Sequence, residues 1–264
     1  MKLVFTILGC GSSGGVPRCD GNWGACDPKE PRNQRLRCSA LIERIGDKGR
    51  TTVLIDTSPD MRTQLLNAGT SRLDGVVFTH DHADHTHGLD DLRIFALNNR
   101  ARIPVHMDRA TGDSLRTRFD YCFRAQSGYP AILESRDITP MQPLRVAGPG
   151  GPIEIMPFRQ LHGEIISLGL RIGGLAYSPD VSGIPEDALP ALENLDVWIL
   201  DALRPTPHPN HFSVSQAVGC IERLGARRGI LTHLHIDCDY QTLKRELPAH
   251  IEPAYDGLAV AFEA

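Results

Sequence analysis

The chain has 264 residues, of which 41% are hydrophobic and 23% are charged, the usual mixture of a folded globular protein. A formal net charge of -4 argues against a nucleic-acid-binding surface, which normally carries a basic excess. The odd number of cysteines, seven, is typical of reduced thiols, and no apolar run approaches the roughly 18 residues of a membrane span. We therefore expect one soluble, cytoplasmic domain over residues 1–264, with no membrane partner.

Short apolar runs that are rich in branched or aromatic residues recur along the chain, and each has the length of a β-strand. The first, Leu3–Leu8, leads into a glycine-rich turn, and the polar stretch from Arg18 to Arg37 predicts a long ordered loop. Further strands are expected over Ser39–Arg44, Thr52–Ile55, Gly75–Phe78, Ile153–Met156, Ser167–Ile172, Leu175–Tyr177, Val197–Leu200 and Gly229–Leu231. Helical patterns cover Asp60–Ala68, Gly88–Asn98, Pro185–Leu195, Ser213–Leu224 and Tyr240–Leu247. Strand clusters with interspersed helices predict a layered α/β protein.

The glycines at positions 9, 11 and 14 satisfy the Gly-x-Gly-x-x-Gly spacing of dinucleotide-binding proteins. In those proteins the glycines open a helix that leads to a second strand. Here Gly15, Val16 and Pro17 lead into the polar loop instead. The pattern therefore does not predict a nucleotide cofactor, and the glycines are better explained by a sharp turn of the backbone.

One segment concentrates potential metal ligands directly after a buried strand. It runs His80-Asp81-His82-Ala83-Asp84-His85 and follows the expected strand Gly75–Phe78. A solvated polar loop is the alternative, but three imidazoles and two carboxylates in six residues favour metal binding. A pair of metal ions that shares a carboxylate can activate water at neutral pH and stabilise a displaced oxygen. The segment therefore predicts a hydrolytic metal centre.

Further ligands are expected where other strands end. His162 follows the strand near residue 156, Asp180 lies just beyond Leu175–Tyr177, and His233 ends the strand near residue 231. His235 is an alternative to His233, because both lie in the segment Thr-His-Leu-His. Ligands of layered α/β proteins usually lie at the carboxyl ends of strands.

With these residues the sequence resembles the metallo-β-lactamase-fold hydrolases, over most of the chain. THDHADH matches the His-x-His-x-Asp-His motif of that family, and later His, Asp and His residues follow in the expected order. The resemblance implies a four-layer αββα sandwich and two divalent ions, manganese or zinc. It assigns one ion to His80, His82 and His162, the other to Asp84, His85 and His233, and a bridging role to Asp180. It also implies that Asp56 supports the ligands by hydrogen bonds.

Within the fold the sequence is most similar to the cyclic phosphodiesterases of phosphonate degradation, which open phosphoribosyl 1,2-cyclic phosphate. Gly14-Gly15-Val16-Pro17 and Arg35-x-Arg37-Cys38-Ser39 match the N-terminal region of those enzymes. Asp201 and, further on, Pro209-Asn210-His211 match a second region. The resemblance implies that His211 is the general acid and that Asp201 supports the centre. Candidates for binding the substrate phosphate are Arg35, Arg37, Arg204 and His208.

The sequence departs from these phosphodiesterases at their additional structural zinc, which three closely spaced cysteines and a histidine bind. Here the N-terminal loop offers only Cys19 and Cys26, which lie seven positions apart, with His235 as a possible third ligand. A structural metal site therefore stays an open alternative, and the identity of the substrate is less certain as a result.

These features together predict an enzyme that hydrolyses a small phosphodiester, a cyclic phosphate of ribose or a nucleotide, by a metal-bound hydroxide, with Asp84 and His211 as catalytic residues. The expected partner is a small phosphorylated substrate and not a polynucleotide, and the family suggests a homodimer. Alternatives on the same fold are a tRNA 3′-processing endoribonuclease, a thioester or lactone hydrolase, and an iron-dependent sulfur dioxygenase. The negative net charge disfavours the endoribonuclease.

Overall fold

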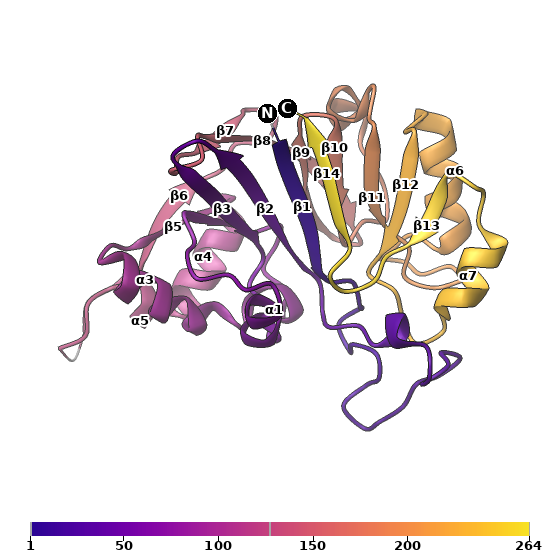
Figure 1. The fold of residues 1–264 in the computed structure, drawn as a ribbon, viewed down its shortest axis with the longest axis horizontal. Helices are drawn as coiled ribbons and strands as arrows, with labels where there is room; N and C mark the ends of the chain where they lie inside the picture. Colours follow the sequence, from indigo (N-terminus) through magenta and orange to yellow (C-terminus); the bar gives the residue numbers. More distant parts are fainter. Residues whose placement is uncertain (1, 127, 264) are drawn as a thin grey trace.

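A computed structural model describes residues 2–126 and 128–263 of the chain. Over these residues two seven-stranded sheets lie face to face, and helices cover their outer faces (Figure 1). This arrangement confirms the expected four-layer αββα sandwich. No helix in the described ranges is long and apolar enough to cross a membrane.

The first sheet has the strand order β14-β1-β2-β3-β4-β5-β6. Antiparallel pairs join β14, β1, β2 and β3, whereas β3, β4, β5 and β6 run parallel. The carboxyl ends of these parallel strands therefore lie at one edge of the sheet. The strands are β1 (Lys2–Gly9), β2 (Ser39–Gly46), β3 (Gly49–Ile55), β4 (Gly75–Val77), β5 (Ile103–Met107), β6 (Leu133–Asp137) and β14 (Ala259–Glu263).

The second sheet has the strand order β13-β12-β11-β10-β9-β8-β7. Here β10, β11, β12 and β13 run parallel, and β7, β8 and β9 form antiparallel pairs. The strands are β7 (Leu144–Val146), β8 (Ile153–His162), β9 (Ile165–Ile172), β10 (Leu175–Ser178), β11 (Val197–Asp201), β12 (Arg228–Thr232) and β13 (Ile251–Pro253).

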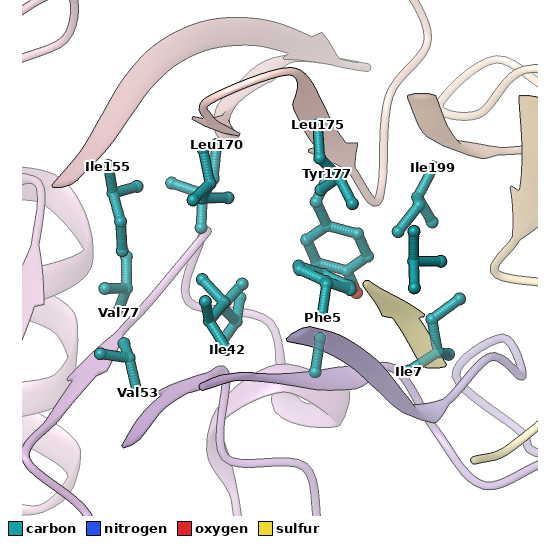
Figure 2. Packing of buried hydrophobic residues seen from close by; sticks show 14 of the residues in the cluster. Phe5, Ile7, Ile42, Val53, Val77, Ile155, Leu170, Leu175, Tyr177 and Ile199 are labelled. Carbon is teal, nitrogen blue, oxygen red and sulfur yellow. The ribbon is translucent and has the colours of Figure 1, made fainter. Parts of the chain in front are cut away.

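The apolar side chains alternate between the two faces of each sheet, as the period of two of a β-strand requires. Ile42 and Val53 point toward the second sheet, whereas their neighbours Leu41 and Leu54 pack under the helices. Figure 2 shows Phe5 and Tyr177 meeting between the sheets, with ring centroids 5.3 Å apart. This inter-sheet core fixes the two sheets relative to each other.

The helices form the two outer layers of the sandwich. The first sheet is covered by α1 (Met61–Asn67), α3 (Arg93–Asn99), α4 (Arg109–Arg118) and α5 (Asp120–Phe123). The second sheet is covered by α6 (Val214–Leu224), α7 (Tyr240–Glu246) and the 3-10 helix η3 (Glu186–Leu192). Shorter elements are η1 (Pro31–Asn33), α2 (Ala83–Thr86) and η2 (Leu89–Leu92).

Most of the expected elements are present, with one instructive difference. The pattern of Pro185–Leu195 predicts an α-helix, but the segment is the 3-10 helix η3, which contains Pro190. Proline has no N–H group and its ring obstructs an α-helix interior, so this expectation is wrong. The helix expected at Ser213–Leu224 is present as α6, and Ser213 and Gln216 form its capping box.

Candidate metal centre

The histidine-rich segment leaves the end of β4 and turns at the short helix α2. His82 is the N-cap of this helix and has an extended backbone (φ -62°, ψ 153°). His80 precedes the helix, while Asp84 and His85 lie in its first turn. The backbone changes from extended to helical at His82. This change directs the pair His80 and His82 and the pair Asp84 and His85 to neighbouring positions.

Three further side chains reach the same place from the second sheet. His162 is the last residue of β8, Asp180 lies two residues beyond β10, and His233 directly follows β12. Asp180 and His233 have left-handed backbones, with φ of 49° and 57°. Such conformations cost free energy for residues other than glycine, and they concentrate at functional sites.

The seven side chains form two adjacent groups that share Asp180. One group is His80, His82, His162 and Asp180, and the other is Asp84, His85, Asp180 and His233. Nε2 of His85 lies 3.0 Å from Oδ1 of Asp180, and Nε2 of His233 lies 3.4 Å from its Oδ2. All of these side chains except His82, which is exposed, and Asp84 are buried. The structure thus brings together the complete expected ligand set.

The donor atoms fit bound metal. Nε2 of His80, His85 and His233 and Oδ1 of Asp180 are buried without a hydrogen-bond partner. Burial of unpaired polar atoms is costly, so such atoms call for an explanation. Imidazole nitrogens and carboxylate oxygens around one point are suitable ligands for zinc or manganese. Two divalent cations, one in each ligand group, would satisfy all four atoms.

Hydrogen bonds from the first sheet orient the imidazoles. Asp56, at the end of β3, accepts from Nδ1–H of His85 (2.7 Å), from N–H of Thr79 (2.8 Å) and from its hydroxyl (2.8 Å). Because that hydroxyl donates to Asp56, it accepts from Nδ1–H of His80 at 3.0 Å. Both imidazoles therefore present Nε2 to the metal site.

A second carboxylate organises the opposite side. Oδ2 of Asp201, at the end of β11, accepts from Nδ1–H of His211 (2.7 Å) and from N–H of Val181 (2.9 Å). The ring of His211 stacks on that of His233, with centroids 4.7 Å apart and an interplanar angle of 13°. Asp201 thereby holds two parts of the centre in place. It binds the backbone next to Asp180, the carboxylate that both groups share, and it binds the ring of His211, the candidate acid.

The charges at the centre shift the pKa of its histidines in opposite directions. Burial lowers the pKa of His80 well below its ordinary value, and the charge of His85 acts in the same direction. Burial also disfavours the charged form of His85, but Asp180, Asp84 and Asp56 outweigh it and raise its pKa well above the ordinary value. Protons and metal ions compete for these nitrogens, so metal affinity should fall in acid.

Two of the expected phosphate-binding arginines are already engaged. Arg35 is 1% exposed, and its guanidinium donates to Oδ1 of Asn33 (3.1 Å) and toward Sγ of Cys26 (3.7 Å). Its assignment to substrate binding is therefore corrected, because it holds the N-terminal loop together. Arg37 makes a two-pronged ion pair with Asp60 (2.7 and 2.8 Å), so its charge is largely neutralised.

The other candidates lie on the side of His211. The ring centroid of His208 is 5.2 Å from that of His211, and Arg204 donates to the carbonyl of Pro207 (3.2 Å). His235 is outside both ligand groups, and it contacts Arg18 and Asp237 instead. The structure thus places His233, and not His235, in the centre.

The alternative of a structural metal at the cysteines finds no geometric basis in the ranges that the structure covers. There no group of three potential ligands includes a cysteine. Cys19 is exposed, whereas Cys26 is buried against Val16, Ile236 and Trp23. The loop is held by apolar packing and by the bonds of Arg35.

Three residues of the site environment are not marked as such by the sequence motifs. Thr79 orients His80, the backbone carbonyl of Asn210 accepts from Nδ1–H of His162 (2.7 Å), and Arg18 contacts His235. The position of Thr79 immediately before His80 is a usable signal. Asn210 lies in the matching segment Pro209-Asn210-His211, but nothing local shows that its carbonyl binds His162, 48 positions away. Nothing local marks Arg18, whose partner is 217 positions away.

Two face-to-face sheets with a multi-histidine centre at the strand ends define the metallo-β-lactamase fold. Residues 51–234 match the model of the beta-lactamase superfamily domain, so the chain belongs to this family and is a hydrolase of the metallo-β-lactamase superfamily.

Individual relatives are similar to this chain over nearly its whole length. A solved structure described as a new diphosphatase from the PhnP family is 34% identical, with a TM-score of 0.88, and the match covers 99% of this chain and 98% of that one. Zn(2+)-bound PqqB from Methylobacterium extorquens is 18% identical, has a TM-score of 0.72 and covers 97% of this chain and 99% of its own, a likeness in fold. An octanoyltransferase of Porphyromonas gingivalis is 35% identical over 256 residues, 96% of this chain. The chain spans only 50% of that relative's length.

Proposed function

We propose that the protein is a phosphodiesterase that uses two divalent ions, manganese or zinc, to hydrolyse a small phosphodiester or diphosphate ester. The observation that carries this proposal is the pair of Asp201 and His211 beside the two ligand groups. His211 and Asp201 form a third group with His233, so a proton donor lies directly next to the metal ligands. The similar diphosphatase, which covers nearly the whole chain, supports the same class of reaction.

The roles of the side chains follow from their contacts. Asp201 accepts from Nδ1–H of His211 and leaves Nε2 of that ring available to the substrate. A carboxylate in this position stabilises the protonated imidazole, as in other acid–base pairs. His211 would then give its proton to the departing oxygen, a step that an alkoxide needs near neutral pH.

The bound ions would activate the attacking water and neutralise charge on the phosphate oxygens. His80, His82 and His162 would hold one ion and Asp84, His85 and His233 the other, with Asp180 between them. The remaining supports, Asp56 and Thr79, keep Nε2 of two ligands directed inward. Asp84 acts here as a ligand, because its carboxylate lies 3.5 Å from Nε2 of His85.

A second candidate is hydrolysis of an acyl thioester. The end of β8 and the start of β9, on either side of His162 and the turn that follows it, expose three large apolar side chains, Leu161 (42%), Ile165 (37%) and Ile166 (43%). These could contact an acyl chain, and the relationship to an octanoyltransferase is consistent with such a substrate. The phosphodiesterase is favoured, because the Asp201–His211 pair suits a poor alkoxide leaving group, whereas a thiolate leaves without a proton.

The test is a substrate panel on protein stripped by a chelator and then reloaded with Mn²⁺ or Zn²⁺. The panel contains a ribose cyclic phosphate, a diphosphate diester, a p-nitrophenyl phosphodiester, octanoyl-coenzyme A and a lactone. We expect metal-dependent turnover of the phosphorus esters. Turnover of the thioester or lactone alone would contradict the proposal and favour the second candidate.

A further inference from the structure

We propose that Arg18, Arg204 and His208 form an anion-binding arc beside the metal centre, and that the arc holds the departing phosphate of a diphosphate diester. Water would add to the phosphorus at the metal centre, the bond from that phosphorus to the bridging oxygen would break, and the phosphate in the arc would depart as a monoester. This inference rests on the proposed function and narrows it from phosphodiesters in general to esters with an adjacent second phosphate. The three residues come from two loops, at positions 18 and 204–208. Arg18 contacts His235, two positions beyond His233, and the ring of His208 lies beside that of His211.

Backbone contacts bring the N-terminal glycine turn to the metal centre. N–H of Ser12 donates to the carbonyl of Leu234 (3.2 Å), and N–H of Leu234 donates to the carbonyl of Cys10 (2.8 Å). A side chain at Gly14 would begin 3.4 Å from Cγ of Arg18, so the stem of this arginine lies along the turn. The stem of Arg18 therefore lies along the turn whose backbone is bonded to Leu234, the residue after His233.

A neighbouring pair of side chains positions the guanidinium of Arg18. Nδ1–H of His235 donates to Asp237 (2.9 Å), so Nε2 of that ring is an acceptor, and it lies 2.5 Å from Nη2 of Arg18. This contact uses one of five N–H donors. Over the ranges that the structure describes, Arg18 has no carboxylate within ion-pair distance. Its remaining donors are free to bind an anion.

Arg204 follows a residue that is hydrogen-bonded to His235, because N–H of His235 donates to the carbonyl of Leu203 (2.9 Å). Nε of Arg204 is buried without a hydrogen-bond partner, and only its Nη2 has an acceptor, the carbonyl of Pro207. Nδ1 of His208 accepts from N–H of Asn210, so Nε2–H of that ring is a third available donor.

Other arginines near the centre already have a carboxylate partner. Arg37 is neutralised by Asp60, and Arg118 by Asp81, with N–O distances of 2.7 Å in both cases. An ion pair that is already satisfied gains little from a ligand, whereas an arginine without a carboxylate partner can bind phosphate through two parallel N–H bonds. Of these four arginines, Arg18 and Arg204 are the two without a carboxylate partner in the described ranges.

His208 connects the arc to the proposed acid, since its ring centroid lies 5.2 Å from that of His211. A phosphate held by the arc would therefore be adjacent to the phosphate at the metal centre, as the two phosphates of a diphosphate are. A simple phosphodiester would leave the arc empty. The geometry predicts discrimination between these two substrates.

The test uses Arg18→Gln and Arg204→Gln, with Arg227→Gln as the matched control. Arg227 precedes β12 at its other end from His233, and its side chain is 83% exposed. The metal-loaded proteins are assayed on ADP-ribose and on the p-nitrophenyl ester of AMP, which lacks the second phosphate. Binding of ADP-ribose to the metal-free proteins is measured by calorimetry, and circular dichroism checks folding.

Loss of one charge-assisted hydrogen-bond donor should lower kcat/KM for ADP-ribose about 10- to 100-fold, mostly through KM. The p-nitrophenyl ester should change less than about 3-fold, and the control should change neither. An equal loss of kcat/KM on both substrates, or unchanged binding of ADP-ribose to both variants, would contradict the proposal that the arc binds a second phosphate. If binding depends on Arg18 but no phosphorus ester is hydrolysed, the proposed function fails while the anion site stands.

Discussion

The two sheets supply the metal centre in different ways. The first sheet delivers its ligands within the single segment His80–His85, whereas the second delivers His162, Asp180 and His233 from three separate strand ends. Each ligand group contains members from both sheets. Neither sheet can therefore form a group by itself, and metal binding requires the assembled sandwich.

The supports of the ligands differ in the same manner. In the first sheet the side chains of Asp56 and Thr79 bind each other and orient the imidazoles of His85 and His80. In the second sheet Asp201 supports the loop of Asp180 and also binds His211. The supports of the first sheet thus act on candidate metal ligands, whereas in the second sheet Asp201 connects the centre to His211, the proposed acid.

The largest effect is expected from Asp180→Ala, which removes the carboxylate shared by both groups. Bound metal should fall by more than half, and kcat/KM for a phosphodiester should fall on the order of 1,000-fold, because metal stabilisation is worth several kcal/mol. Metal content is measured by elemental analysis and activity by initial rates.

Asp81→Asn is the matched control, since Asp81 lies in the same histidine-rich segment. Its carboxylate accepts from Ser114 (2.6 Å) and Arg118 (2.7 Å), outside both ligand groups. It should retain full metal content. If Asp180→Ala also binds metal fully, the segment of the first sheet suffices and the comparison of the two sheets is wrong.

His211→Ala tests the assignment of proton transfer to the second sheet. Hydrolysis of an alkyl phosphodiester should slow about 100-fold or more, because general acid catalysis contributes this much to a poor leaving group. A p-nitrophenyl ester, which needs little protonation, should slow less than about 10-fold. Metal content should not change.

His250→Ala, at an exposed position before β13, serves as the control for loss of a histidine. An equal loss on both esters, or no loss on the alkyl ester, would remove His211 from the acid role.

The same contrast explains what the sequence can predict. The segment His80–His85 is continuous, so its density of ligands is apparent from the order of the residues alone. The distant ligands follow from strand ends and the family resemblance, since Asp180 is about a hundred positions from His80. Arg35 is misassigned on this basis, because its place before a strand does not reveal that its partners, Asn33 and Cys26, bury it.

Between residues 99 and 150 the sequence pattern also fails to predict elements of the fold. The apolar pattern there does not predict the strands β5 and β6 or the helix α4. β6 has the sequence LESRD and α4 the sequence RATGDSLRTR, so both carry few apolar side chains. Their places depend on pairing with β5 and on packing against the first sheet, which local periodicity does not encode.

Asp56→Asn should have a smaller effect that falls mainly on one ligand group. Asp56 binds Nδ1–H of His85, in the group with Asp84 and His233, directly, whereas it reaches His80 of the other group only through the Thr79 hydroxyl. Loss of such a support typically lowers metal affinity about 10- to 100-fold. Titration with a chelating dye should therefore show one weakened site and one nearly unchanged site.

Asp74→Asn is the control, because Asp74 is a buried carboxylate that precedes β4 and accepts from N–H of Thr52 (2.9 Å). It should affect stability and not metal affinity. Equal weakening of both sites in Asp56→Asn would show that the first sheet acts as one unit.

The smallest effect concerns the connection that joins the two sheets. Asp256 lies between β13 of the second sheet and β14 of the first, and it accepts from N–H of Cys10 (3.0 Å) and Leu36 (2.7 Å). Burial raises its pKa to about 7, from a value near 3.9 in an unfolded chain. The folded protein thus binds this proton more tightly, and its contribution to stability declines as the pH rises toward 7.

Asp256→Asn should remove that decline, which we expect to be about 1–2 kcal/mol of unfolding free energy between pH 5 and pH 7. Urea unfolding of the metal-free protein at the two pH values measures it. Asp239→Asn is the control: burial opposes it, but hydrogen bonds from Asn33 and Thr242 lower the pKa of Asp239 to about 2. Its contribution to stability is lost only in stronger acid, so the slope between pH 5 and pH 7 should persist. The opposite result is that the variant Asp256→Asn shows the same change of unfolding free energy with pH as the unaltered protein. That result would mean that Asp256 is already ionised in the folded protein, stabilised by the N–H groups of Cys10 and Leu36.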